Sequence, residues 1–420
     1  MTLPEEVDVL IVGFGAAGAA AAIAAHDQGA STIIVEKTPA GGGNCVHSGG
    51  FLFEVEGPAA VDHLDALCFG KTDRTVLSAF AQGSGELRPW LQSMGVPIEP
   101  VDIREFAGLL PSWPLFPGAG RVTYSRSVAQ PAGPGLWTPL ATGVAQRNIP
   151  VALDTPAVRL VLSDGAVTGA VVGNDGATRA IHARGGVVLA CGGFEYDAEL
   201  RDTYLPLPLV PVGHPGNTGD ALTLAAAADA SLWHMSAFFG WLAFVAPGFA
   251  SGFPLDVHAP SFLFVDGDGR RFADETGWEV HDKVRSLTAY LPRRPNRPRL
   301  PGFIVFDERA RLAGPLNGIV GTPNDYVWSA DNAAEIRRGW IKRGDTPGEL
   351  AEVTGVDRAT FIETMEDYGR ASRAGVDDAF GRSPDTLVAL GRPLYAIEFW
   401  PGVATASGGP RRDERARVLR

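Results

Sequence analysis

A glycine-rich turn between a buried strand and a helix constrains the fold of this chain more than any other stretch. An apolar run from Asp8 to Val12 predicts a strand, and an alanine-rich run from Ala16 to Gln28 predicts a helix that ends at Gly29. Thr32 to Val35 predicts a second strand. Two strands joined by a crossover helix form a βαβ unit, which implies a parallel sheet. The sequence therefore predicts an α/β fold at its N-terminal end.

The glycines of this turn have the spacing of a dinucleotide-binding site. Gly13, Gly15 and Gly18 form G-x-G-x-x-G directly after the strand and at the start of the helix. In that context the first glycine permits the tight turn, the second lets the backbone approach a pyrophosphate, and the third lets helix and strand pack closely. The N-terminus of the helix adds unpaired N–H groups and a partial positive charge for phosphates. The alternative is a glycine-rich turn without a ligand.

The end of the second strand carries a carboxylate, Glu36. A carboxylate at this place can accept hydrogen bonds from the two hydroxyls of an adenosine ribose, and it would repel a 2′-phosphate. NADP is therefore disfavoured. The fingerprint by itself leaves FAD and NAD open.

A second glycine cluster follows the second strand at once. Residues 42–44 read Gly-Gly-Asn and residues 48–50 read Ser-Gly-Gly. This backbone can wrap a pyrophosphate and approach a flat ring closely. A NAD-dependent dehydrogenase would usually continue into another helix here, so the cluster favours FAD over NAD.

The middle of the chain changes pattern. From Val151, short alternating strands with turns at 163–165 and 173–176 predict an antiparallel meander, which leads to an apolar strand within 185–195. Beyond about Asp220 the chain is rich in aromatic residues, proline and glycine, which indicates a separate module.

One helix in this second module has clear end and face signals. Asp357 is predicted to be its N-cap. Phe361, Ile362, Met365 and Tyr368 are predicted to form its apolar face.

Composition excludes several classes of function. The 420 residues carry a net charge of −12, so binding to nucleic acid or to anionic lipid has no global electrostatic basis. No apolar run approaches the ~20 residues that span a bilayer, and the start does not have the pattern of a signal peptide. Cys45, Cys68 and Cys191 form no C-x-x-C pair, which disfavours a disulfide framework, a zinc cluster and an attached haem. We expect a cytoplasmic protein without a metal.

Five motifs occur in the order known from one flavoprotein family. They are the stretches Glu36–Gly50, Val187–Glu195, Gly216–Leu222, Asp266–Glu275 and Pro393–Leu419. They resemble, respectively, E-K-x-x-x-x-G-G-N/S-x-x-x-S-G-G, V-x-L-A-T-G-G-F, T-G-D-G, G-x-R-F-x-N-E and P-x-Y-A-x-x-x-x-P-G-x-x-x-T-x-G-G. The chain thus resembles the fumarate reductase and succinate dehydrogenase superfamily, which includes ketosteroid dehydrogenases and urocanate reductases.

The resemblance implies FAD as the cofactor and a divided architecture. We expect a Rossmann-like FAD-binding domain with an antiparallel β-meander at 1–227, an inserted α+β capping domain at 228–385 and a return to the first domain at 386–420. The residues expected to bind FAD are Gly13, Gly15, Ala16, Ala17, Gly18, Glu36, Lys37, Gly42, Gly43, Asn44, Cys45, Ser48, Gly49, Gly50, Ala157, Cys191, Gly192, Gly193, Asn217, Thr218, Gly219 and Asp220.

The chain departs from the family pattern where fumarate reductases hold their substrate. Their proton-donating arginine corresponds to Glu279, and the histidine expected before T-x-G-G corresponds to Ala404 or Thr405. Two carboxylates need cationic partners to replace their water, so a small dicarboxylate substrate is disfavoured. The tyrosine that ketosteroid dehydrogenases place at the Glu279 position is missing as well.

Candidate acid or base groups lie where the family has its proton donor. His281 and Glu279 come first, followed by Tyr290, and the alternative is that all three are surface groups. Arg271 is a further catalytic candidate, although an ion pair that anchors the cap is the preferred role.

Aromatic residues between 110 and 124 predict an apolar entrance to the site. Trp113, Phe116 and Tyr124 lie there among prolines, with Tyr124 as a catalytic candidate and local packing as the alternative. They favour a bulky, largely apolar substrate.

The predicted reaction is that of the family. Hydride moves between the flavin and a carbon–carbon bond beside a carbonyl, and a small carbonyl-bearing molecule is the expected partner. Family members continue past the last motif with a G-L-Y-A-A-G-E strand and a helix that faces the flavin, whereas this sequence stops at Arg420. The alternative function is therefore a catalytically incomplete FAD-binding protein or subunit.

Overall fold

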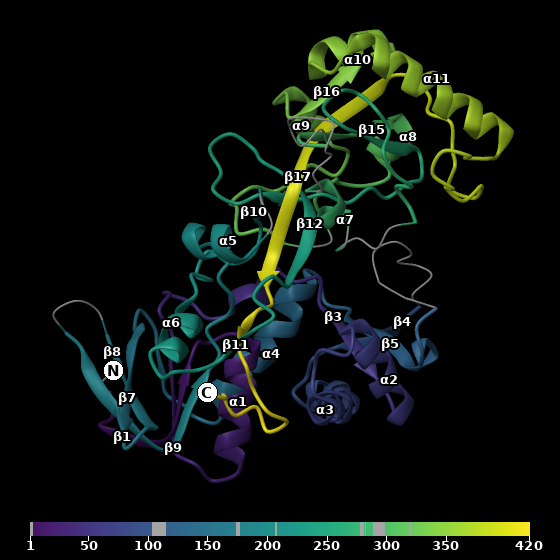
Figure 1. Ribbon diagram of the computed structural model, residues 1–420. Helices are drawn as coiled ribbons and strands as arrows, with labels where there is room; N and C mark the ends of the chain where they lie inside the picture. The colour runs from purple at the N-terminus through teal and green to yellow at the C-terminus, as the bar shows by residue number, and fades with distance from the viewer. Residues whose placement is uncertain are drawn as a thin grey trace.

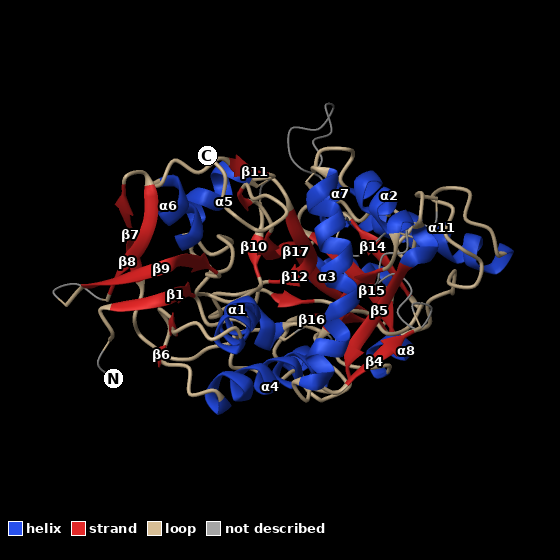
Figure 2. Cartoon of the chain, turned by 90° about the horizontal axis from the view of Figure 1, so that it is seen from below, coloured by secondary structure: helices blue, strands red, loops and turns tan. Residues whose placement is uncertain are grey.

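A computed structural model describes residues 3–102, 115–173, 177–205, 208–277, 281, 283–288, 299–318 and 321–420. Two large sheets form the framework, and the longest strand, β17 (Leu394–Ala406), runs from one part of the molecule into the other (Figure 1). Seen from below, β1 and β9 lie toward one end, β14 and β15 toward the other, and β12 and β17 between them (Figure 2).

The first sheet contains the predicted βαβ unit. Its strand order is β6-β2-β1-β9-β8-β7, with parallel pairing from β6 to β9 and antiparallel pairing from β9 to β7. The strands are β1 (Glu6–Val12), β2 (Thr32–Val35), β6 (Val151–Ala152), β7 (Ala157–Ser163), β8 (Ala166–Val172) and β9 (Arg179–Leu189). The α/β fold and the antiparallel meander are thus confirmed.

Helix α1 (Ala16–Asp27) crosses between β1 and β2 and packs on one face of this sheet with α4 (Ala132–Gln146). Its buried residues, among them Ala22 and Ile23, meet Leu140 and Val144 of α4 in one apolar cluster. Small alanine side chains let the helix lie close to the strands, and burial of this face stabilises the unit.

A three-stranded sheet follows the second glycine cluster and was not predicted. Its strand order is β3-β5-β4, helix α3 packs on β3 and β4, and helix α2 packs on α3. The elements are the 3-10 helix Gly43–His47, β3 (Phe51–Val55), α2 (Pro58–Leu67), α3 (Arg74–Ser93), β4 (Ile98–Val101), the 3-10 helix Ala119–Arg121 and β5 (Val122–Ser127).

The second large sheet is organised around β17. Its main order is β13-β12-β17-β15-β14, and β10 and β16 also pair with β17. The strands are β10 (Val210–Pro211), β12 (Phe238–Phe244), β13 (Phe253–Pro254), β14 (Phe262–Val265), β15 (Gly302–Asp307) and β16 (Ile341–Gly344).

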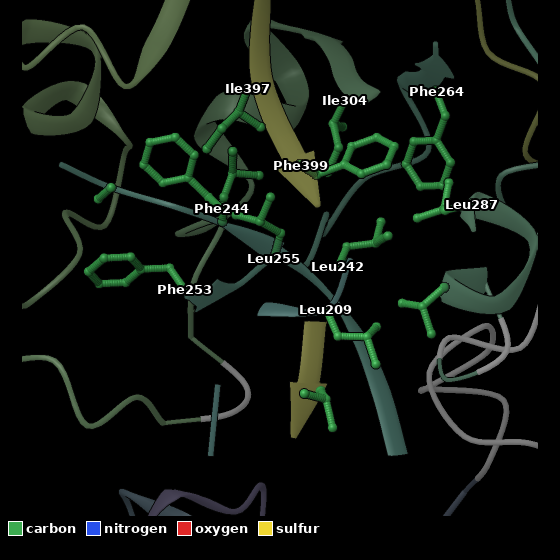
Figure 3. Packing of buried hydrophobic residues seen from close by; sticks show 14 of the residues in the cluster. Leu209, Leu242, Phe244, Phe253, Leu255, Phe264, Leu287, Ile304, Ile397 and Phe399 are labelled. Carbon is green, nitrogen blue, oxygen red and sulfur yellow. The ribbon is translucent and has the colours of Figure 1, made fainter. Parts of the chain in front are cut away.

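Large apolar side chains fill the space around β12 and β17. Figure 3 shows Phe244 and Leu242 close to Ile397 and Phe399, with Phe253 from β13 at one side. These five residues are at most 6% exposed. Phe244, Leu242 and Phe253 lie in the range 228–385 that the sequence assigned to a separate module, whereas Ile397 and Phe399 lie in the range 386–420.

Seven further helices and one strand pair complete the described chain. They are α5 (Ala198–Tyr204), α6 (Asp220–Ala226), α7 (Lys283–Leu287), α8 (Glu308–Leu312), α9 (Ala333–Arg337), α10 (Pro347–Thr354) and α11 (Arg358–Ala374), with the strand pair β11 (Leu232–Trp233) and β18 (Gly409–Pro410). The Asp357 side chain accepts a hydrogen bond from Thr360 N, and Phe361 and Tyr368 are buried, as predicted for α11. The boundaries 1–227, 228–385 and 386–420 stay predictions.

Candidate functional site

A cavity of about 520 Å³ opens at the carboxyl ends of β1, β2 and β9. This is the place where open α/β sheets bind ligands. The predicted FAD-binding residues that line it are Gly13, Gly15, Ala16, Ala17, Glu36, Lys37, Gly42, Gly43, Asn44, Cys45, Ser48, Ala157, Cys191, Gly192, Gly193, Asn217 and Asp220. Tertiary folding therefore brings residues from four of the five motifs around one space.

The two glycine clusters lie side by side at the start of α1. Gly15 and Gly42 form an isolated parallel bridge, and Gly42 N donates to Phe14 O at 2.7 Å. Gly13 has a φ of +105°, and a Cβ there would overlap Ala190 O. A Cβ at Gly18 would overlap Gly13 O, so close packing of helix and strand needs glycine at this position.

The first turn of α1 is open toward the cavity. Ala16 and Ala17 line it, and the N-cap Gly15 has no side chain that could occupy the free N–H groups. Phosphate oxygens would accept hydrogen bonds from these groups.

The Glu36 carboxylate is held by the backbone beside this turn. Its Oε2 accepts from Phe14 N at 2.8 Å, and its Oε1 accepts from Thr38 N at 2.9 Å and from Thr38 Oγ1 at 2.7 Å. A carboxylate has about four lone-pair sites, so this one retains acceptor capacity for ribose hydroxyls. The glycine cradle, the open helix end and Glu36 together fit an extended FAD.

Lys37 forms one side of the cavity through contacts with α6. Its Nζ donates to Thr218 Oγ1 at 2.7 Å and forms an ion pair with Asp220 Oδ2 at 2.8 Å. Gly219 is the N-cap of α6. Thr218 and Gly219, which do not line the cavity, therefore hold Asp220 and Lys37 in place.

The remaining predicted FAD-binding residues do not line the cavity but support the backbone next to it. Gly49 O accepts a hydrogen bond from Arg126 Nε at 3.0 Å. A Cβ at Gly50 would lie 2.9 Å from the Cβ of Ala132, so Gly50 allows β3 to approach α4. Gly18, Gly49 and Gly50 are not among the lining residues.

Ten lining residues were not predicted from the sequence. They are Val12, Val35, Thr38, Phe51, Leu136, Ala190, His214, Gly216, Thr405 and Ala406. Several of them lie within or beside the recognised motifs, so the motifs could have identified them from the sequence. Leu136 comes from α4 and had no signal, because only packing of that helix brings it to the cavity.

Two cysteine thiols line the cavity in neutral form. Burial raises the pKa of Cys45 to about 11. Burial, with Asp220 nearby, raises the pKa of Cys191 to about 12. Neither thiol is a thiolate nucleophile near neutral pH. Among the described residues, no group of three or more His, Cys, Asp or Glu side chains is placed to hold a metal ion.

His214 lines the cavity, and His47 lies beside it. The rings of His47 and His214 are 5.8 Å apart. Burial, together with the neighbouring His214, lowers the pKa of His47 to about 4, and burial lowers the pKa of His214 as well. Both rings are therefore neutral at pH 7.

His281, the first catalytic candidate, packs against β12. Its Nδ1 lies 2.9 Å from Gly240 O, and its ring contacts Phe239 and Trp241. Phe239 is paired with Thr405 across β12 and β17, and Thr405 lines the cavity. His281 is thus one strand away from the cavity wall.

Arg271 is tied into a buried ion-pair network instead of facing the cavity. Its guanidinium pairs with Glu275 and with Asp377, each at 2.8 Å, and Arg382 pairs with Glu275 at 3.0 Å. Their side chains are at most 7% exposed. These buried ion pairs favour a structural, anchoring role for Arg271 over a catalytic one.

The remaining candidates that the structure describes, Tyr124 and Phe116, do not line the cavity. Tyr124 is buried in β5 with its ring 5.6 Å from that of Phe53. Phe116 lies beside His63, with ring centroids 6.4 Å apart. Glu279, Tyr290 and Trp113 lie outside the described residues.

Comparison with known proteins gives the same family throughout the chain. A family model described as "FAD binding domain" matches residues 8–420. The 3-oxosteroid 1-dehydrogenase of Mycolicibacterium smegmatis is 27% identical over 519 residues, covering 99% of this chain and 89% of that protein. The NADH:fumarate oxidoreductase of Klebsiella pneumoniae is 27% identical over 435 residues, covering 99% of this chain and 43% of that protein.

Solved structures share the fold. The 3-ketosteroid delta1-dehydrogenase from Sterolibacterium denitrificans, in complex with 1,4-androstadiene-3,17-dione, has a TM-score of 0.84 at 22% sequence identity. The superposition covers 99% of this chain and 91% of that solved chain. An open flavocytochrome c3 fumarate reductase has a TM-score of 0.73 at 27% identity, with coverages of 99% and 70%. Within the described part, no helix has both the length and the apolar character to cross a bilayer.

Proposed function

Because the chain belongs to the FAD-binding flavoproteins of the fumarate reductase and succinate dehydrogenase superfamily, we propose that it oxidises or reduces a carbon–carbon bond beside a carbonyl group. The chain is an FAD-dependent oxidoreductase related to 3-ketosteroid dehydrogenases and fumarate reductases. The proposed substrate is bulky and largely apolar.

The residue types at the family's substrate positions are the observation that carries the substrate class. The proton-donating arginine of fumarate reductases corresponds to Glu279, and the histidine before T-x-G-G corresponds to Ala404 or Thr405. A dicarboxylate would lose its water without gaining these cationic partners, whereas a carbonyl compound does not need them.

Aromatic side chains supply an apolar surface next to the cavity. Phe51 lines it, and Phe239 is 41% exposed on the strand position opposite Thr405. Flat, apolar rings pack well against such side chains. The 3-oxosteroids named for the relatives belong to this class of molecule.

The chain's own residues have distinct proposed roles. Glu36 holds the adenosine ribose, and the first turn of α1 holds the pyrophosphate. FAD, when bound, supplies the hydride chemistry. His281 is the proposed acid or base, and its Nδ1, 2.9 Å from Gly240 O, carries a proton because a carbonyl oxygen only accepts hydrogen bonds.

Anaerobic flavin absorbance tests this function. We expect a saturated 3-oxosteroid to bleach the oxidised flavin, or a steroid enone to reoxidise the reduced flavin, while succinate and fumarate have no effect. H281N should slow the flavin step by about 10²-fold or more, with unchanged flavin content. Reaction with succinate or fumarate alone would contradict the substrate class. Absence of reaction with any of these compounds would contradict the proposed function.

A further inference from the structure

A buried carboxylate, Glu195, lies behind the cavity wall and takes no part in the roles assigned above. Its residue is 0% exposed, and it directly follows the Gly-Gly-Phe motif after β9. No Lys or Arg of the described chain forms an ion pair with its side chain. The Arg201 guanidinium donates instead to the main-chain oxygen of Glu195, at 2.8 Å.

Three hydrogen-bond donors from three distant segments converge on this carboxylate. Asn217 Nδ2 donates to Oε1 at 2.5 Å, Asn44 Nδ2 donates to Oε1 at 3.2 Å, and Ala406 N donates to Oε2 at 3.0 Å. All three donating residues line the cavity. An ionised carboxylate only accepts hydrogen bonds, which matches three donors. Burial raises the pKa of Glu195, and these hydrogen bonds oppose the rise.

The surroundings determine the rotation of both amides. Asn44 Oδ1 accepts from His214 N at 2.6 Å, while its Nδ2 also donates to Ala404 O at 3.0 Å, so neither atom can exchange places with the other. Asn217 directs Nδ2 to Glu195, and its Oδ1 lies toward Gly192, a residue of the cavity wall.

Two glycines make room for this arrangement. A Cβ at Gly193 would overlap Glu195 Oε2, and a Cβ at Gly213 would lie 2.7 Å from Asn44 Oδ1 and 3.1 Å from Glu195 Oε1. Glycine at these positions lets two main-chain segments close around the carboxylate.

We propose that Glu195 is a positioning residue for the cofactor: its carboxylate fixes the rotation of the Asn217 amide, helps His214 N and Ala404 O to fix that of Asn44, and so sets the cavity wall that FAD contacts. The inference rests on the cofactor and is independent of the proposed substrate. Glu195 acts through its neighbours, because Glu195 itself is not among the lining residues.

A donor–acceptor exchange tests this role with the holoprotein. In E195Q the side-chain NH₂ faces at least one of the three donors. We expect FAD to bind about tenfold or more weakly, as for loss of one hydrogen bond to a charged group.

In E195Q/N217D the Gln amide can donate to the Asp carboxylate, and the total charge equals that of the parent. This double variant should reverse at least half of the change that E195Q causes in the logarithm of the FAD dissociation constant. The dissociation constant is measured from the fluorescence of flavin released on dilution, and visible circular dichroism reports the environment of the bound flavin.

E335Q is the matched control. Glu335 is also 0% exposed, and it accepts hydrogen bonds from Tyr326 Oη at 2.6 Å and from Ser329 N at 3.0 Å, but it does not line the cavity. It should lower the thermal unfolding midpoint while leaving the FAD dissociation constant within about twofold. FAD binding by E195Q within twofold of the parent, no recovery in the double variant, or loss of the far-UV circular dichroism of E195Q would each overturn the proposal.

Discussion

At the scale of single residues, burial and donor geometry decide the charge state of the groups around the cavity. The thiols of Cys45 and Cys191 and the ring of His47 are held neutral because charging them would cost desolvation. The Glu36 carboxylate nearby accepts hydrogen bonds from N–H and O–H donors. The same short stretch of sequence therefore provides neutral groups and a hydrogen-bonded carboxylate within one cavity.

His47 makes stability depend on pH below neutrality. Its pKa in the folded protein is about 4, below the ordinary value of 6.5, so between these values the unfolded chain binds a proton that the folded chain does not. The contribution of the neutral His47 ring to the free energy of unfolding is fully present above pH 6.5 and is lost as the pH decreases toward 4. H47Q should flatten this dependence of the thermal unfolding midpoint. H26Q, at an exposed histidine, should leave it unchanged, and equal slopes for H47Q and the parent would contradict the assignment.

At the scale of elements, close packing of α1 on β1 forms the cradle. The overlap of a Cβ at Gly18 with Gly13 O means that any side chain must push the helix away from the turn. The effect should reach FAD, because the first turn of the same helix lines the cavity.

G18A should therefore weaken FAD binding and destabilise the protein together. Overpacking of this kind costs about 1–3 kcal/mol. G83A is the control: Gly83 is in the middle of α3, and a Cβ there meets nothing within 4 Å. Replacing a helical glycine by alanine should stabilise by about 0.5–1 kcal/mol without changing FAD binding. Flavin content and the unfolding midpoint of both variants are the measurements, and a G18A protein with full flavin content would argue against the packing role.

At the scale of the whole molecule, the two large sheets have separate cores, and β17 of the second sheet runs toward the cavity, whose wall contains its Thr405 and Ala406 (Figure 1). Between residues 262 and 382, the second part is also held by the ion-pair network around Glu275 and Arg382. Arg382 is 1% exposed and additionally donates to Phe262 O and Pro260 O, each at 2.7 Å. Removing one member of such a network leaves buried polar groups without partners.

R382M should destabilise the second part by about 3 kcal/mol and leave the FAD cradle folded. Limited proteolysis should then cut within the predicted range 228–385 faster than in the parent, while the flavin stays bound. R370A, which removes an exposed ion pair with Asp367, should have little effect. Simultaneous loss of flavin and of all protease resistance would contradict the predicted division into domains.

The local signals of the sequence predicted the first βαβ unit, the meander and the N-cap at Asp357, because glycine spacing, hairpin turns and capping act between neighbours in the chain. The three-stranded sheet β3-β5-β4 was not predicted, because its pairing joins segments that no short sequence pattern connects. The cavity residues were predicted where they lie in motifs, and Leu136 was not.

The sequence by itself determined the family, the cofactor and the order of the motifs, because each depends on residue types at fixed short spacings. Only the tertiary structure decided which of these residues face one cavity, that Arg271 belongs to a buried network, and that Glu195 joins segments 44, 217 and 406. The physical reason is that hydrogen bonds and burial between distant segments depend on how the chain closes on itself, which no local pattern specifies.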